Sequence, residues 1–320
     1  MRKEEYVPGT RRNEEGMLYR YMGRSGLEIS VIGLGGSHMG KIKDREECIR
    51  LIRNAVDRGI TFMDNSWDYE EGESESRMGE ALKGGYRQRV VLMTKIDART
   101  KEAAAKQIDE SLTRLKADHV DLMQFHEVIR MEDPDRIFAE GGAMEAMVEA
   151  QKAGKVRFIG FTGHKDPFIH IRMLDLAAKH GFRFDAVQMP LNVMDAHFRS
   201  FEHTALPILV KERIGVLGMK CMGGGEILES GLVNPTECLH YALNLPLSTM
   251  IAGIEDMEML NNTFEAVRNF KPLTDDEVSA LLSRTKEAAL SGKYELFKTH
   301  VVYDMTTKHP EYMGYEVVSG

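Results

Sequence analysis

Short runs of apolar, mostly β-branched residues alternate along the chain with longer segments in which apolar residues recur at helical spacing. The first pattern is typical of strands and the second of amphipathic helices. The strand-like runs begin about every 30 residues, which is the length of one strand–helix unit. Several of them, such as residues 90–93, are continuously apolar, which indicates strands covered on both faces and therefore parallel. The predicted strands are residues 29–34, 61–65, 90–95, 120–126, 156–162, 186–189, 214–220 and 249–254.

The segments between these runs carry helix signals. Ile49, Ile52 and Val56 fall on one side of the first segment and would form the apolar stripe that packs on a sheet. Thr100 is a candidate N-cap, and Pro235 would occupy the first position of a later helix. The predicted helices are residues 44–58, 100–115, 143–152, 166–179, 234–243, 256–270 and 274–290.

This alternation fits either an open doubly wound sheet or a closed barrel. The number and even spacing of the strands favour the α/β class and a (β/α)8 TIM barrel. No linker rich in Pro, Gly or Ser divides the chain, so we predict one barrel domain over residues 20–291. Residues 1–19 would form an N-terminal arm, mobile or covering one end of the barrel, and residues 292–320 a C-terminal tail.

Composition excludes several classes of protein. In 320 residues, 42 Lys and Arg stand against 50 Asp and Glu, and a net charge of −8 leaves no basic excess for nucleic-acid phosphates. The longest apolar runs are strand-sized, which argues against a membrane protein. Cys48, Cys221 and Cys238 are too far apart to suggest a disulfide framework or a metal site. Because no apolar signal segment follows Met1, we predict a cytoplasmic protein.

Polar residues end three consecutive predicted strands. Asp64, Lys95 and His126 each interrupt an apolar run, and Tyr69 follows Asp64 by a short loop. In barrels of this kind the active groups gather at the carboxyl ends of the strands, so these four side chains could converge. Taken singly, Asp64 and Lys95 could be a structural ion pair and His126 a buried core histidine. The joint pattern favours a catalytic site.

The four groups suit proton delivery to a carbonyl oxygen. A tyrosine hydroxyl is a weak acid at neutral pH, and the ammonium of Lys95 would lower the pKa of Tyr69. Asp64 would hold Lys95 in place, and His126 would donate a hydrogen bond to the carbonyl oxygen. Hydride for the carbonyl carbon must come from a nicotinamide cofactor, because side chains cannot supply it.

Two other enzyme classes fit less well. Residues 33–38 place His38 where the dinucleotide-binding glycine motif requires its third glycine. A metal-dependent barrel hydrolase could use Asp64, His126 and His164, but the sequence offers no clear fourth ligand and no early His-x-His pair. We therefore expect no metal. A cofactor-binding regulatory barrel with little turnover remains the alternative function.

At these residues the chain resembles the aldo-keto reductase family. The segment from Gly59 through Asp64 to Tyr69, GITFMDNSWDY, is similar to the first signature of that family. The resemblance extends over roughly Tyr21 to Leu282, most of the chain. Further similar segments are residues 91–95, residues 121–126, residues 156–162, Gln188 and residues 214–223.

The resemblance implies carbonyl reduction by NADPH or NADH without a metal. It assigns Tyr69 as the general acid, Lys95 and Asp64 as the groups that tune it, and His126 as the group that orients substrate; Trp67 would line the substrate pocket beside His126. The cofactor-binding residues that it implies are Gly35, Gly36, Ser37, Asp64, Thr162, His164, Gln188, Met219, Lys220, Cys221, Met222, Gly223, Gly253, Ile254, Glu255, Met259 and Asn262.

The chain departs from the family pattern at three places, the first of which is Met219, where many members stack an aromatic residue on the nicotinamide. Thr162 and His164 stand where many members have Ser-Asn, so His164 would replace an amide contact. Glu255 lies where many members read the adenosine 2′-phosphate; a carboxylate there favours NAD, whereas the family as a whole favours NADP. The expected partner is a small carbonyl compound or sugar, with tail aromatics such as Tyr303 as a second pocket wall. Assembly into a homo-oligomer is left open.

Overall fold

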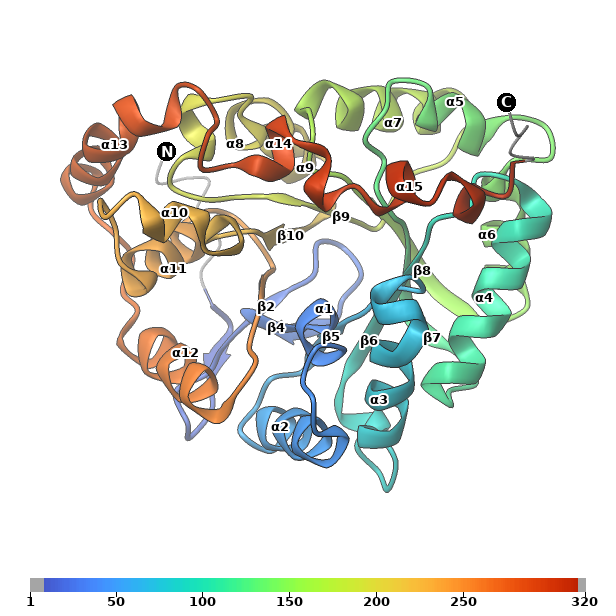
Figure 1. Cartoon of the computed structure of the whole chain (residues 1–320), viewed down its shortest axis with the longest axis horizontal. Helices are drawn as coiled ribbons and strands as arrows, with labels where there is room; N and C mark the ends of the chain where they lie inside the picture. The colour runs from blue at the N-terminus through green and yellow to red at the C-terminus, as the bar shows by residue number, and fades with distance from the viewer. Residues whose placement is uncertain (1–8, 316–320) are drawn as a thin grey trace.

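The computed structural model describes residues 9–315, so the first eight residues of the predicted arm and the last five of the tail lie outside it. Within the described residues, eight parallel strands close into a barrel in the order β10-β11-β4-β5-β6-β7-β8-β9. Helices surround it, so the chain has the predicted (β/α)8 fold (Figure 1). The barrel strands are β4 (Ile32–Gly35), β5 (Phe62–Asp64), β6 (Val91–Ile96), β7 (Val120–Phe125), β8 (Val156–Thr162), β9 (Ala186–Pro190), β10 (Gly215–Met219) and β11 (Thr249–Ala252).

The first predicted strand is two strands in the structure. β3 (Glu28–Ser30) pairs antiparallel with β2 (Leu18–Tyr21), whereas β4 pairs in parallel with β5 in the barrel. The sequence gives little sign of the break at Val31, because Ser30 is the single polar residue between the apolar Ile29 and Val31. Ile29 packs with Phe62 inside the barrel. Residues on both sides of the break are therefore buried and apolar, although they belong to different sheets.

Most of the predicted helices form within one or two residues of their expected limits. Asp44 caps its helix by accepting hydrogen bonds from two backbone amides, and Asn234 and Thr274 each form a capping box. Thr100 occupies the N-cap position, but its side chain makes no hydrogen bond to the helix. These helices are α2 (Arg45–Asp57), α4 (Lys101–Leu115), α6 (Ala143–Lys152), α7 (Pro167–Lys179), α11 (Pro235–Asn244), α12 (Met257–Asn269) and α13 (Asp275–Ala289).

The other helices were not predicted, because apolar residues do not recur in them at helical spacing. α3 (Glu73–Ala81) buries Ser74, Glu75 and Arg77 against the barrel, so its inner face reads as polar. In residues 9–315, none of the helices has the length and apolar character needed to cross a bilayer. The remaining helices are α1 (Gly36–Met39), α5 (Asp133–Phe138), α8 (Phe201–Thr204), α9 (Leu206–Lys211), α10 (Glu226–Glu229), α14 (Leu296–Thr299) and α15 (Met305–Lys308).

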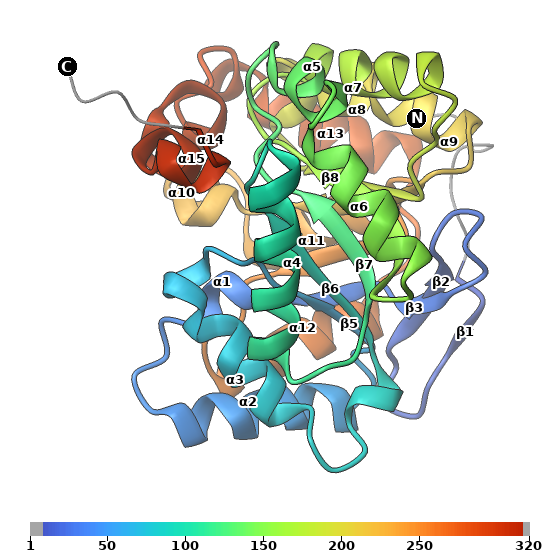
Figure 2. The same ribbon diagram turned by 90° about the vertical axis from the view of Figure 1, so that its right-hand side faces the viewer.

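Residues 9–31 close the amino end of the barrel. β1 (Arg11–Arg12), β2 and β3 form a small antiparallel sheet, and Figure 2 shows it at the end of the barrel opposite the C-terminal segment. Met22 and Ile29 reach inside the barrel. Arg20 is fully buried and donates to the backbone carbonyls of Leu243 (2.7 Å) and Leu247 (2.9 Å). Within the predicted arm, Met17, Leu18 and Tyr19 are buried in the core, so this part of the arm packs against the barrel.

Residues 292–315, here named the C-terminal segment, cross the other end of the barrel, where the strands finish (Figures 1 and 2). A buried network anchors its start: the Lys298 Nζ lies 2.6 Å from Asp195 Oδ1 and 3.0 Å from Glu295 Oε1. Because a buried ammonium must be paired, these contacts fix the direction in which the segment leaves α13.

The middle of the C-terminal segment is bound by the ends of β7 and β8. Glu127 is the second residue after β7. It accepts hydrogen bonds from the amides of Met305 and Thr306, both at 2.8 Å, and from the Thr306 hydroxyl at 2.6 Å. Asp304 lies 3.0 Å from both His164 Nε2 and Lys165 Nζ. Each of these ionic contacts joins the segment to the rim of the barrel mouth.

Replacing Phe62 by Ala tests the packing inside the barrel. Phe62 is fully buried with Met22, Ile29 and Leu122, so we expect the free energy of unfolding to fall by about 3–5 kcal/mol, as for other buried aromatic truncations. Urea unfolding measures this. Phe168→Ala is the matched control, because Phe168 is 63% exposed and its loss should change stability by less than about 0.5 kcal/mol. Equal effects of the two substitutions would contradict the assignment of the core.

Replacing Glu127 by Ala should loosen the C-terminal segment. The substitution removes the acceptor of the Met305 and Thr306 amides, and because such charged hydrogen bonds are strong, we expect these amides to exchange with solvent faster by roughly tenfold or more. Hydrogen exchange followed by mass spectrometry measures the effect. Glu311→Ala removes a carboxylate from the exposed surface of the same segment and should leave the exchange unchanged; unaltered exchange in both variants would refute the anchoring role.

Candidate active site

Three of the four residues predicted to be catalytic meet at one ammonium group. Lys95 Nζ donates to the carboxylate of Asp64, to the backbone oxygen of Asn65 (2.7 Å) and to the hydroxyl of Tyr69 (3.1 Å). Lys95 and Asp64 are almost fully buried. The ring of His126 packs edge-on against Tyr69, with 5.7 Å between the ring centroids. The structure thus brings all four side chains together.

Strand register and a strained loop produce this arrangement. Asp64 ends β5, Lys95 lies near the end of β6, and His126 directly follows β7, so the carboxyl ends of three neighbouring strands present them on one side. The loop after β5 then turns sharply: Glu70 and Glu71 have φ of 49° and 55°. Left-handed backbone at two non-glycine residues costs about 1–3 kcal/mol each, and strain of this kind is common at functional sites.

The acidity of Tyr69 differs from the sequence-based expectation. Burial raises the pKa of the Tyr69 hydroxyl well above its usual range, and the nearby carboxylates of Asp64 and Asp68 raise it further. The sequence analysis expected a lowered pKa from the neighbouring Lys95; the net shift is upward, because burial and the carboxylates dominate it. The sequence could not reveal how completely the phenol is buried. At neutral pH Tyr69 holds its proton and is a hydrogen-bond donor.

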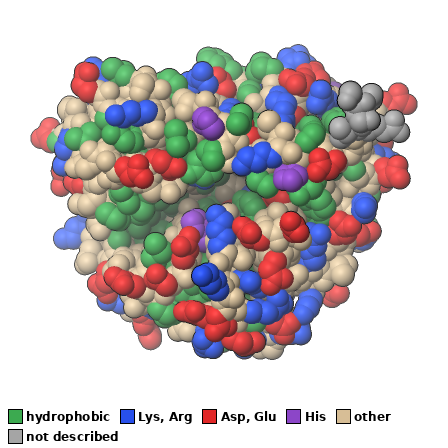
Figure 3. Space-filling model, in the orientation of Figure 1, with side chains coloured by type: hydrophobic (Ala, Val, Ile, Leu, Met, Phe, Trp, Pro, Cys, Tyr) green, Lys and Arg blue, Asp and Glu red, His purple; other side chains and the backbone are tan. Residues whose placement is uncertain are grey.

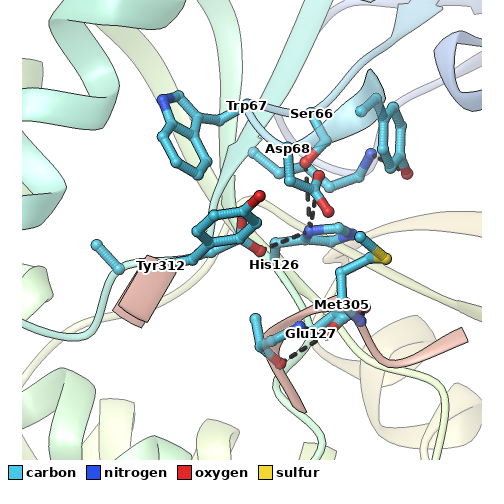
Figure 4. Close-up of polar contacts among 12 residues, drawn as sticks. Ser66, Trp67, Asp68, His126, Glu127, Met305 and Tyr312 are labelled. Carbon is cyan, nitrogen blue, oxygen red and sulfur yellow. Dashed lines mark hydrogen bonds and ion pairs between the residues drawn. The ribbon is translucent and has the colours of Figure 1, made fainter. Parts of the chain in front are cut away.

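His126 is surrounded by acidic groups on its Nδ1 side. This atom lies 2.9 Å from Asp97 Oδ1, 3.2 Å from Ser66 Oγ and 3.5 Å from Asp68 Oδ1. Figure 4 shows Ser66 and Asp68 directed at the imidazole from one side, with Glu127 and Met305 on the other. Burial is the main cause of all three pKa shifts: it lowers the pKa of His126 and raises the pKa of Asp68 to about 7 and of Asp97 to about 8.

Asp68 and Asp97 were missed by the sequence analysis. The available signal was their position: Asp68 precedes Tyr69, and Asp97 follows Lys95 by two residues. The ligand-type atoms of Asp68, Asp97 and His126 all lie within 4.8 Å of one another. Such spacing can serve a shared proton or a cation, and the direct contact between His126 and Asp97 is that of a hydrogen bond.

Two unpaired polar atoms beside Asp64 fit the predicted nicotinamide site. Thr162 ends β8 and is the register partner of Gln188 on β9. The Thr162 hydroxyl and the Gln188 Oε1 are buried without a hydrogen-bond partner, whereas Gln188 Nε2 donates to Asp64 Oδ2 at 2.7 Å. Buried polar groups normally have partners. A carboxamide, which carries both donors and an acceptor, would satisfy both atoms.

The glycine loop after β10 lies beneath the C-terminal segment. Lys220 has a left-handed backbone (φ 58°), and its ammonium lies 3.8 Å from the centre of the Tyr303 ring. Burial lowers the pKa of Lys220 to about 8. Tyr303 in turn donates to Glu226 at 2.5 Å. The other predicted cofactor residues of this loop are Met219, at the end of β10, the buried Cys221 and Gly223, and the half-buried Met222.

The remaining predicted cofactor residues form two groups. Gly35, Gly36 and Ser37 lie at the end of β4 beside Asp64, and a Cβ on Gly36 would come within 2.6 Å of the Asp64 carbonyl, so the backbones approach closely there. The second group follows β11, farther along the rim, where the His38 Nδ1 lies 2.5 Å from Glu255 Oε1. In that group Ile254 is buried, and Gly253, Glu255, Met259 and Asn262 are exposed.

Trp67 and His164 contact the C-terminal segment. The Trp67 ring packs edge-on against Tyr312 at 5.0 Å, and its Nε1 donates to Glu110 at 2.7 Å. His164 Nε2 lies 3.0 Å from Asp304. Figure 3 shows the face of the barrel hollowed at its centre, next to the C-terminal segment. The segment thus borders the mouth in which the four central side chains lie.

Comparisons with known proteins find oxidoreductases with related sequences. A model of the aldo/keto reductase family matches residues 31–237. The uncharacterized oxidoreductase YqkF of Bacillus subtilis is 23% identical over 89% of this chain and 99% of its own length. L-galactose dehydrogenase of Arabidopsis thaliana is 29% identical over 83% of this chain and 95% of its own. Aldo-keto reductase YhdN of Bacillus subtilis is 31% identical over 65% of this chain and 63% of its own.

A solved structure supports the same fold. The holo form of aldo-keto reductase AKR11C1 from Bacillus halodurans superposes with a TM-score of 0.71, at 22% identity, over 87% of this chain and 99% of that one. The family model covers well over half of the sequence, including Asp64, Lys95 and His126. The chain therefore belongs to the aldo/keto reductase family of oxidoreductases, whose members in general use NAD(P)H to reduce carbonyl groups.

Proposed function

We propose that this protein reduces the carbonyl group of a small aldehyde, ketone or sugar to an alcohol with NADPH or NADH, using Tyr69 as the general acid. One observation carries the proposal: a buried ammonium, Lys95, binds the Tyr69 hydroxyl and the Asp64 carboxylate at once. A phenol in contact with a fixed cation is suited to release its proton to a substrate oxygen, because the cation stabilises the phenolate that remains.

The side chains divide the work between cofactor and substrate. When bound, the reduced nicotinamide supplies hydride to the carbonyl carbon. Thr162 and Gln188 would hold its carboxamide through their unpaired buried atoms. Tyr69 keeps its proton until a substrate oxygen arrives, and Lys95 then faces the oxygen that loses the proton. His126, next to Tyr69, would orient the substrate oxygen from the other side.

Polar groups near Tyr69 favour a hydroxylated substrate. The imidazole of His126 lies beside the Tyr69 ring, and a hydroxyl group of the substrate can both donate and accept hydrogen bonds there. A relative with the printed name L-galactose dehydrogenase covers most of the chain at 29% identity, which supports a sugar or sugar-like substrate. A panel of sugars and short aldehydes, assayed by NADH and NADPH oxidation, tests the proposal; no turnover of any carbonyl would refute it.

Tyr69→Phe should abolish most of the activity. The substitution removes the proton donor and keeps the ring against His126, so turnover should fall by roughly two to four orders of magnitude. Steady-state kinetics measures the loss, and a thermal melt verifies folding. In the control Tyr86→Phe, the lost hydroxyl donates to Asp57 at the exposed surface, and turnover should be unchanged. Full activity of Tyr69→Phe would reassign the acid.

Glu255→Gln should change the choice of cofactor. Glu255 is half-exposed and carries a negative charge where the adenosine 2′-phosphate of NADP would lie. Removing the charge should raise the ratio of kcat/KM for NADPH over NADH by roughly five- to tenfold, the effect of one solvent-screened charge contact. Glu287→Gln, on the exposed face of α13, is the charge-matched control. An unchanged ratio would place the adenosine end elsewhere.

A further inference from the structure

Two carboxyl groups behind His126 have no role in the mechanism described above. Asp68 is 4% exposed and Asp97 is fully buried. Both oxygens of Asp68 and the Oδ2 of Asp97 are buried without a hydrogen-bond partner. Two unsatisfied carboxylates in a buried site are costly, and one added proton would reduce the cost.

We propose that Asp97 and Asp68 share a proton with His126, and that this proton keeps a hydrogen on His126 Nε2 for donation to the substrate oxygen. The proposal rests on the carbonyl-reducing function above and deepens it. Asp97 and Asp68 act through His126, so they are positioning residues.

The geometry connects the shared proton to Nε2. Asp97 Oδ1 and His126 Nδ1 lie 2.9 Å apart. A neutral imidazole already has one N–H, and the shared proton is a second one, held between these two atoms. Whichever of them holds it, the other hydrogen of the imidazole is on Nε2. An imidazolium has hydrogens on both nitrogens, and a neutral ring that accepts from a carboxylic acid at Nδ1 has its hydrogen on Nε2. If the cluster loses the proton, Nδ1–H donates to the Asp97 carboxylate and Nε2 becomes a bare acceptor, which would repel a carbonyl oxygen.

The two carboxyl groups of the cluster gain and lose protons near neutral pH. Burial lowers the pKa of His126, and it raises the pKa of Asp68 to about 7 and of Asp97 to about 8. Interacting groups of this kind titrate as a unit. The cluster therefore holds its proton below neutral pH and loses it as the pH rises through about 7 to 8, and reduction should decline over that range.

Other charged groups around the cluster are already paired. Lys95 binds Asp64, and Glu127 accepts three hydrogen bonds from the C-terminal segment. On β6 and α3, Thr94 donates to Glu75 at 2.6 Å.

The loop beyond β6 and the C-terminal segment complete the surroundings. Arg99 donates to the His126 carbonyl at 2.7 Å and lies 3.3 Å from Asp133. Tyr312 keeps its proton because burial raises the pKa of its hydroxyl. Asp68, Asp97 and His126 thus face one another, with the uncharged Ser66 hydroxyl 3.2 Å from His126 Nδ1.

Two substitutions of Asp97 separate proton sharing from simple packing. Asp97→Ala removes the partner of Nδ1, so the rate of carbonyl reduction at about pH 6 should fall roughly tenfold to a hundredfold. Asp97→Asn offers an amide N–H to Nδ1 and imitates the protonated acid at every pH, so activity should persist and the decline between about pH 7 and 8 should disappear. Asp68→Asn should move this decline.

Asp121→Asn is the matched control for these variants. Asp121 is a buried carboxylate near the start of β7, at the opposite end of the strand from His126, and it pairs with Arg87 at 2.9 Å. Its loss should lower stability and leave the pH profile in place. A profile with the same decline in wild type, Asp97→Ala and Asp97→Asn would overturn the proposal, as would a stoichiometric metal ion in the purified protein.

A measurement without substrate keeps the test independent of the proposed function. In wild-type protein with 15N-labelled histidine, assigned by the loss of one signal in His126→Gln, Nε2 should carry hydrogen at about pH 6 and Nδ1 alone at about pH 9. A single tautomer of His126 across that range would overturn the proposal. Absence of carbonyl turnover with the expected titration would refute only the function.

Discussion

The active end of the barrel depends on how one buried ammonium is neutralised. Lys95 is 1% exposed, and an unpaired charge at that depth would be strongly destabilising. Its three N–H donors have three acceptors: Asp64, the Asn65 carbonyl and Tyr69. The hydrogen bonds of the ammonium therefore fix the end of β5, the loop that follows it and the Tyr69 phenol in one geometry.

The same burial leaves an excess of carboxylates, and the structure accommodates each in a different way. Glu127 binds amides and a hydroxyl of the C-terminal segment, so the electrostatics of the site and the docking of the segment depend on the same group. Asp97 binds His126. Asp68 lies 3.5 Å from His126 Nδ1, and burial raises its pKa to about 7, which reduces its negative charge near neutral pH. The docking of the C-terminal segment, the protonation of His126 and the pKa of Tyr69 are thus linked through these carboxylates.

The barrel could be predicted from the sequence because the regular spacing of the apolar runs indicates the strands, and the polar residues that end three of them indicate the site. Strand-sized apolar runs interrupted by a polar residue at one end were sufficient to locate Asp64, Lys95 and His126, and their convergence follows from parallel register. The break at Val31 and helix α3 were missed because their burial does not follow a regular apolar period. The Asp68–Asp97–His126 cluster and the contacts of the C-terminal segment depend on approaches between distant residues, which local patterns do not record.

The raised pKa of Tyr69 could not be predicted for the same reason, and it is compatible with reduction. An alkoxide formed from a carbonyl is a stronger base than a phenolate, so a proton moves from Tyr69 to the substrate oxygen even when burial makes the phenol a weak acid. Oxidation of an alcohol would instead need the phenolate as base, and this form is scarce at neutral pH when the pKa is high. For the reaction proposed above, the burial that holds the Lys95 ammonium against Asp64 therefore also keeps Tyr69 in the protonated form that carbonyl reduction requires at neutral pH.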